Sequence, residues 1–150
     1  MSITTWVGYD RPMTLTEAAW PDRARSGGAM LDSWMDGLHA SHRGSDAVDT
    51  VIGHSYGSTL VGGAATGGHH LAADNVIAVG SPGMLSRHAT DLALDSGAAV
   101  YSMTAGNDPI SLVTSLTLGS DPNDADYGAV RLVTNPGAAL PYSAGVLPGL

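Results

Sequence analysis

One stretch near the middle of the chain, Val48–Gly68, constrains the fold more than any other. A β-branched run leads directly into the motif GHSYG (residues 53–57), and small and apolar residues that favour a helix follow. A strand, a tight turn and a helix with a serine between two glycines is the G-x-S-x-G pattern of a nucleophile elbow. The serine backbone is strained in such a turn, so we expect Gly53 and Gly57 to allow a close approach of strand and helix.

An ordinary connection between a strand and a helix, without chemistry, is the alternative interpretation of this motif. Glycine and serine are common here, and the chain has 20 glycines, so the five-residue motif alone is weak evidence for an elbow. The predicted strand before the motif and the predicted helix after it favour the elbow. The sequence therefore predicts Ser55 as a candidate nucleophile.

The length of 150 residues indicates one domain, large enough to bury a core. No apolar run reaches the 18 residues that a membrane helix needs, and residues 1–20 do not have the pattern of a signal peptide. These features predict a protein without a membrane span and favour a cytoplasmic location. The chain has no cysteine, which excludes disulfides and thiolate metal sites.

The net charge of −8 comes from 14 acidic residues against six arginines. An acidic chain without basic clusters argues against nucleic acid as a partner. No phosphate-binding loop or dinucleotide motif is present, because Gly62-Gly63 falls within the predicted helix, where we expect it to let that helix pack close to the sheet. The pairing of His39 and His42 with Asp36, and the acidic run at residues 121–126, are better explained as a helix end and a turn than as metal sites. We expect no cofactor and no metal.

The pattern along the whole chain predicts an α/β fold with a mainly parallel sheet and helices on both faces. A capping-box spacing at Thr14 and Glu17 predicts a short helix, and apolar residues at helical spacing predict a longer amphipathic helix over residues 24–40. Residues 135–150 are rich in Pro and Gly and are expected to be irregular. The predicted strands are residues 3–7, 48–53, 75–80, 98–104 and 128–134.

Four motifs spread over most of the chain resemble the alpha/beta-hydrolase superfamily. They are WVGYDRP (residues 6–12), GHSYGS (53–58), VGSPGM (79–84) and NDPI (107–110). The chain is most similar to an uncharacterised actinobacterial branch with the GHSYGS elbow. The resemblance implies that Ser55 attacks a carbonyl, that the backbone N–H of Tyr56 donates to the oxyanion, and that Asp108, just after the strand at 98–104, is the acid of a catalytic triad. On local sequence alone, a turn carboxylate ahead of Pro109 is an equal alternative for Asp108.

The resemblance also implies a histidine after the strand at 128–134, and the chain has none there. All six histidines precede Asp108, and Tyr142, near the expected place, is a poor base because a phenol has a pKa of about 10. If residues 3–7 form the fourth strand of the family, three strands and the loop that supplies the second oxyanion donor are also missing. The chain therefore resembles the middle of a hydrolase, truncated at both ends.

The resulting hypothesis is a serine esterase or lipase-like hydrolase that acts on a small-molecule ester or lipid-like substrate, with its histidine outside this chain. One alternative is a catalytically dead remnant or interaction domain that retains the hydrolase core. Another is a half-domain that a partner chain completes. A sheet without its first strands has an open edge, so we expect the isolated chain to be poorly soluble or to associate with itself or with a partner.

Overall fold

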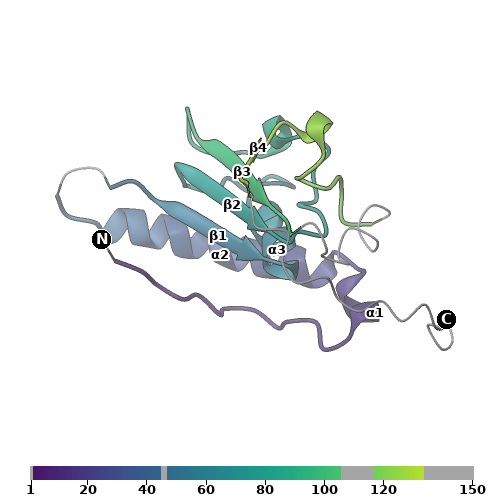
Figure 1. Ribbon diagram of the computed structural model, residues 1–150. Helices are drawn as coiled ribbons and strands as arrows, with labels where there is room; N and C mark the ends of the chain where they lie inside the picture. The colour runs from purple at the N-terminus through teal and green to yellow at the C-terminus, as the bar shows by residue number, and fades with distance from the viewer. Residues whose placement is uncertain (1, 45–46, 106–116, 134–150) are drawn as a thin grey trace, which may run out of the picture.

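The computed structural model describes residues 2–44, 47–105 and 117–133, and from the second helix onward the described elements alternate between helix and strand (Figure 1). The predicted irregular tail at 135–150 lies outside these residues. The elements, in chain order, are α1 (Leu15–Ala18), α2 (Asp22–Ser41), β1 (Thr50–His54), α3 (Tyr56–Ala64), β2 (Asn75–Val79), η1 (Ala89–Asp91), β3 (Ala99–Met103), η3 (Ala125–Tyr127) and β4 (Val130–Arg131).

The four strands form one parallel sheet in the order β1-β2-β3-β4. Each pair of neighbours is connected by a segment that crosses over the sheet, which is the arrangement that alternating strands and helices predict. The register places Ile52, Ile77, Tyr101 and Val130 in one row across the sheet. The predicted parallel α/β fold is thus confirmed.

Four of the five predicted strands are present, with shifted ends. β1 begins two residues later than predicted and continues through His54, whereas β2 and β3 lie within one residue of their predicted bounds at each end. β4 is only Val130–Arg131, and residue 134 lies outside the described part of the chain.

The prediction of a strand over residues 3–7 is wrong. Residues 2–8 run beside α2 without joining the sheet, and within the described residues β1 pairs with β2 alone (Figure 1). A β-prone segment becomes a strand only when a neighbouring edge supplies hydrogen-bond partners. Ile3 and Val7 accordingly remain 85% and 74% exposed.

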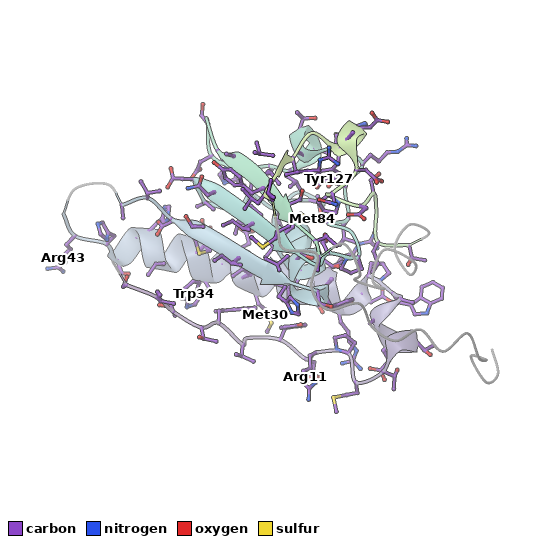
Figure 2. The ribbon with its side chains drawn as sticks, viewed as in Figure 1. Arg11, Met30, Trp34, Arg43, Met84 and Tyr127 are labelled. Atoms are coloured by element: carbon purple, nitrogen blue, oxygen red, sulfur yellow. The ribbon has the colours of Figure 1, made fainter. Side chains whose placement is uncertain are left out.

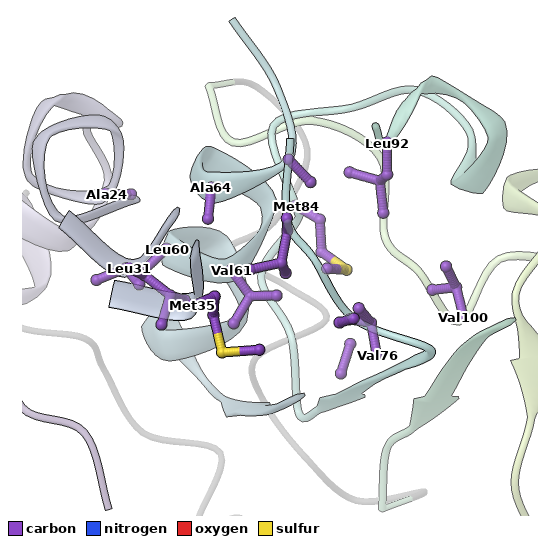
Figure 3. Packing of buried hydrophobic residues seen from close by; sticks show 14 of the residues in the cluster. Ala24, Leu31, Met35, Leu60, Val61, Ala64, Val76, Met84, Leu92 and Val100 are labelled. Atoms are coloured by element: carbon purple, nitrogen blue, oxygen red, sulfur yellow. The ribbon is translucent and has the colours of Figure 1, made fainter. Parts of the chain in front are cut away.

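Helices on both faces were also predicted, but the two long described helices, α2 and α3, pack on the same face of the sheet. The buried side chains of Val76 and Val100 meet those of α3 and α2 in one core between the layers (Figure 3). On the opposite face, Ile52 and Val130 are 65% and 55% exposed. Amphipathic periodicity predicts that a helix packs on a sheet, but it does not predict on which face.

Contact between α2 and α3 depends on glycines. A Cβ on Gly28 would lie 2.4 Å from the backbone carbon of Gly63, and a Cβ on Gly63 would lie 2.5 Å from the carbonyl oxygen of Ala24. Gly63 therefore lets α3 approach α2, not the sheet as predicted from the sequence. On α2, Leu31 and Met35 are buried, whereas the apolar Met30 is 57% exposed.

α1 begins at the predicted cap. Thr14 Oγ1 accepts a hydrogen bond of 3.2 Å from the N–H of Glu17, as in a capping box. The Glu17 carboxylate reaches back to the N–H of Met13 at 2.9 Å, one residue before the position that the motif specifies. The short helix ends before Pro21, which precedes the first residue of α2.

Tyr127 connects the segment before β4 to the loop after β2. Its side chain is 1% exposed, and its hydroxyl lies 2.7 Å from Ser86 Oγ. Burial raises the pKa of Tyr127 to about 12, although the hydrogen bond with Ser86 acts in the opposite direction. The neutral phenol is therefore the form that the folded state holds.

We predict that the fold loses stability between pH 10 and pH 12 through Tyr127. In this range the unfolded phenol, with a pKa near 10, ionises before the folded one, so unfolding becomes more favourable by at most about 2–3 kcal/mol. Urea denaturation at pH 8, 10 and 12 measures this loss. The Tyr127→Phe variant serves as the control and should lack this part of the pH dependence; an equal loss in both proteins would contradict the prediction.

Candidate active site

Ser55 is the single residue between β1 and α3, at the carboxyl end of the sheet. Its backbone has φ 52° and ψ −130°, a conformation that side-chain-bearing residues rarely adopt and that costs on the order of 1–3 kcal/mol. The Ser55 N–H donates to the carbonyl of Val79 in β2 at 2.9 Å, which fixes the turn to the neighbouring strand. The strained elbow geometry that the sequence predicts at Ser55 is present.

The two elbow glycines differ in what surrounds them. A Cβ on Gly53 would lie 2.5 Å from Cα of Ser58 and 2.8 Å from the carbonyl oxygen of Gly57, so strand and helix could not approach as they do. A Cβ on Gly57 would meet nothing within 4 Å among the described residues. Among the described residues, the close approach expected at both glycines is therefore present at Gly53 and absent at Gly57.

We predict that Gly53→Ala and Gly57→Ala have opposite effects on stability. Gly53→Ala should destabilise the fold by about 2 kcal/mol or more, because backbone atoms of α3 occupy the place of the new methyl. Gly57→Ala should be neutral or stabilise by up to about 1 kcal/mol, because alanine favours helix and restricts the unfolded chain. Thermal or urea unfolding of the matched pair tests this, and similar losses in both variants would contradict it.

Two buried hydroxyls, those of Ser58 and Ser81, form a chain of hydrogen bonds that ends at the Ser55 carbonyl. Ser58 Oγ lies 2.6 Å from the carbonyl oxygen of Ser55 and 2.7 Å from Ser81 Oγ, and Ser81 Oγ accepts the N–H of Gly83 at 3.1 Å. A hydroxyl has one hydrogen, so all partners are satisfied when Ser81 donates to Ser58 and Ser58 donates to Ser55. Ser58 and Ser81 are 0% and 2% exposed, which makes these bonds costly to break.

We predict that Ser58→Ala and Ser81→Ala each cost about 1–3 kcal/mol of stability, because each leaves a buried hydrogen-bonding group without its partner. The double variant should lose less stability than the sum of the two single losses, with a coupling energy of about 0.5–3 kcal/mol. The reason is that the second substitution removes a group that the first had already left without a hydrogen-bond partner. Chemical denaturation of the parent protein, the two single variants and the double variant gives the four stabilities that this double-mutant cycle needs. Strict additivity would show that the hydroxyls act independently.

Tyr56 joins the elbow to the start of α2. Its hydroxyl donates to the carbonyl of Trp20 at 2.7 Å and accepts the N–H of Ala24 at 3.1 Å. Pro21, at the N-cap of α2, makes no side-chain hydrogen bond, so Tyr56 satisfies a first-turn N–H that a serine or aspartate cap would otherwise serve. Burial raises the pKa of the Tyr56 phenol above its ordinary value, with the Ala24 N–H opposing the shift.

The backbone N–H of Tyr56 is the first of α3. First-turn N–H groups have no acceptor within their own helix, and the helix dipole adds partial positive charge at this end. An anion that develops next to Ser55 would therefore meet N–H groups already oriented toward it. This geometry supports the expected oxyanion role of Tyr56, which stays a prediction.

Asp108 and the rest of the NDPI motif lie outside the described residues, as does Tyr142, so the acid stays a prediction. Three described histidines contact carboxylates beside the amino ends of the strands. These contacts lie at the opposite end of the sheet from Ser55, which follows the carboxyl end of β1. His39 lies 2.8 Å from Asp49, which precedes β1, and His69 and His70, which precede β2, lie 2.8 Å from Asp32 and 3.5 Å from Asp95 respectively. These contacts explain the three histidines as partners of nearby carboxylates.

The acidic run before β4 is a turn. Asp121 Oδ1 accepts the N–H of Asn123 at 2.8 Å, a local hydrogen bond typical of aspartate in turns. Burial raises the pKa of the Asp121 carboxyl, and the N–H of Asn123 opposes the shift. Within residues 2–44, 47–105 and 117–133, no three His, Cys, Asp or Glu side chains come together in a way that could hold a metal ion.

Comparison with known proteins agrees with the elbow geometry. The sequence model of the family described as alpha/beta hydrolase matches residues 1–118, which include Ser55 and its supporting strands. The chain belongs to the alpha/beta hydrolase family. Its parallel sheet is consistent with part of that fold.

Three relatives of this alpha/beta hydrolase are uncharacterized mycobacterial proteins. Rv2079 of Mycobacterium tuberculosis is 36% identical over 172 aligned positions, which cover 98% of this chain and 25% of the relative. Rv0963c of the same species and Mb0988c of Mycobacterium bovis are each 32% identical over 135 positions, covering 89% of this chain and 50% of each relative. The chain thus spans a quarter to a half of the length of these relatives. No solved structure matches it significantly.

Sequence reasoning found Ser55 but missed the side chains that hold it. Ser58 and Ser81 stand inside the motifs GHSYGS and VGSPGM, and the recurrence of serine beside the glycines was the available signal. The hydroxyl of Tyr56 gave no signal, because its partners Trp20 and Ala24 lie more than 30 residues earlier.

None of the described helices is both long and apolar enough to cross a membrane.

Proposed function

We propose that this alpha/beta hydrolase cleaves carboxylic esters of small or lipid-like molecules with Ser55 as the nucleophile. The observation that carries the proposal is the backbone of Ser55, held at φ 52° between β1 and α3 by the Gly53–Ser58 contact and the Ser58–Ser81 hydroxyls. A turn that is this strained and this well supported is typical of a site where the strain serves the chemistry.

In the proposed mechanism, Ser55 Oγ attacks the ester carbonyl and passes its proton to a histidine. The N–H of Tyr56 stabilises the oxyanion of the tetrahedral intermediate, an effect worth about 3–4 kcal/mol for one donor in related chemistry. Asp108 orients the histidine and stabilises its cation. The histidine itself is supplied from outside the 150 residues, since all six in the chain precede Asp108 and three of them already bind carboxylates beside the amino ends of the strands.

We predict that the purified chain hydrolyses a short-chain p-nitrophenyl ester faster when imidazole is present, and that this gain requires Ser55. Imidazole in solution can act as the absent base, and positioned general bases contribute about 10²–10⁴-fold, so a free one should recover a measurable fraction. Release of p-nitrophenol at pH 7.5 is followed over a range of imidazole concentrations. The saturable part of the rate should disappear in Ser55→Ala.

The Ser55→Ala protein at the same imidazole concentration is also the control for direct attack of imidazole on the ester. Equal rates for the two proteins at every concentration would refute a competent nucleophile in this chain. That outcome would favour the second candidate, a domain that retains the hydrolase core without its chemistry, which the lack of a histidine after β4 motivates.

A further inference from the structure

Two large apolar side chains are exposed at the two ends of α1. Met13, two residues before this helix, is 70% exposed, and Trp20, two residues after it, is 58% exposed, although tryptophan is on average a highly buried residue. The Met13 N–H donates to the Glu17 carboxylate at 2.9 Å and the Trp20 N–H donates to the Glu17 carbonyl at 3.2 Å, so one helical turn holds both residues. We call Met13 and Trp20 the α1 patch.

Trp20 is connected directly to the nucleophile elbow. Its carbonyl oxygen accepts the hydrogen bond of 2.7 Å from the hydroxyl of Tyr56, the residue that follows Ser55. The carbonyl of the preceding residue, Ala19, accepts a hydrogen bond from Thr117 Oγ1. The helix α1 lies toward the end of the sheet to which the strands point, the end that carries the elbow (Figure 1). A surface that contacts the α1 patch would therefore have a fixed orientation relative to the nucleophile.

The charge around the α1 patch differs from that of the rest of the chain. Residues 9–25 contain three arginines and three acidic residues, so this stretch is neutral and the remainder carries the whole net charge of −8. Arg23 lies 3.3 Å from the Glu17 carboxylate. Arg11 points outward from the molecule in Figure 2 and, like Arg25, forms no ion pair with any described residue. The patch thus combines apolar side chains with free guanidinium groups.

This combination favours a lipid surface as the binding partner. Tryptophan is enriched at membrane–water interfaces because its ring is apolar and its N–H is polar, and arginine extends an apolar stem toward the headgroups. A protein partner fits less well, since a stable interface buries about 800 Å² on each side, far more than two side chains supply. The net charge of −8 selects a zwitterionic lipid surface, because an anionic one would repel the rest of the chain.

We propose that the α1 patch docks this chain reversibly onto a zwitterionic lipid surface, with Trp20 and Met13 among the upper parts of the acyl chains and Arg11 at the phosphates. The inference rests on the proposed function, because docking would bring Ser55 to the place where lipid-like esters are found. Interfacial binding of this kind depends on the apolar area that enters the lipid. It should therefore persist when salt is added.

The first test uses phosphatidylcholine vesicles whose acyl chains carry bromine, which quenches the fluorescence of a tryptophan that touches it. The chain has three tryptophans, Trp6, Trp20 and Trp34. Unbrominated vesicles should shift the emission of the parent protein to shorter wavelength, and brominated vesicles should quench it. The Trp20→Phe variant retains an apolar side chain, so it should still bind while most of the quenching disappears.

The second test measures affinity by co-sedimentation with phosphatidylcholine vesicles. Trp20→Ser should weaken binding at least about tenfold and Met13→Ser should weaken it less, because each removes apolar area from the interface. Met30→Ser is the matched control and should bind as the parent does, since Met30 is 57% exposed but lies more than two turns into α2 (Figure 2). Trp20 binds Tyr56 through its backbone, so we expect these variants to fold, and equal melting temperatures verify this.

Several results would overturn the proposal. Quenching that persists in Trp20→Phe, or equal binding by the Trp20→Ser and Met30→Ser proteins, would show that the α1 patch does not enter the lipid. Tighter binding to anionic phosphatidylglycerol vesicles that added salt abolishes would assign the attraction to the arginines alone. An absence of vesicle binding would also refute docking, and a shift of the Trp20 emission with protein concentration would then assign the patch to a second copy.

Docking and hydrolysis are measured separately. The Ser55→Ala protein should bind phosphatidylcholine vesicles as tightly as the parent does, because Ser55 is not part of the α1 patch. A loss of vesicle binding therefore refutes the docking proposal, whereas a lack of Ser55-dependent ester cleavage refutes the proposed function.

Discussion

The change of direction over Ser55 is the constraint on which the rest of this structure depends. One residue must convert the end of β1 into the start of α3, and it does so only with its backbone in the left-handed half of φ space. The turn persists because its surroundings over-determine it. Gly53 leaves room for Ser58, the Val79 carbonyl holds the Ser55 N–H, and buried hydroxyls hold its carbonyl. The local strain is thus offset by bonds that the sheet and the next loop supply.

The parts of the fold that were predictable are those set by local sequence. The alternation of β-branched runs with helical segments identified β1 to β4, and the glycines around Ser55 identified the elbow, because both signals are read within a few residues. The helix predicted over residues 24–40 followed from its apolar spacing, and α2 extends two residues before it and one residue after it.

The features that the sequence did not predict correctly depend on contacts between residues far apart in the chain. Residues 3–7 have every local preference of a strand, but a strand also needs an adjacent edge, and composition does not show whether one lies within reach. Gly57 and Gly63 were assigned contacts that only the arrangement of α2, α3 and the sheet decides. The roles of Ser81 and of the Tyr56 hydroxyl likewise depend on partners more than 20 residues away. Asp108 lies outside the described residues, so its predicted role stays a prediction.

The two hydrogen bonds of the Tyr56 hydroxyl have a consequence for how such a protein can change over generations. Tyr56, whose backbone N–H we propose as the oxyanion donor, also closes the first turn of α2 with its side chain. A substitution that repositions the start of α2 would therefore shift the elbow as well, and a change that loosens the elbow would fray the helix. Selection for the stability of the fold and selection for the position of Ser55 therefore act on the same side chain, that of Tyr56. A substitution at this residue would change both properties together.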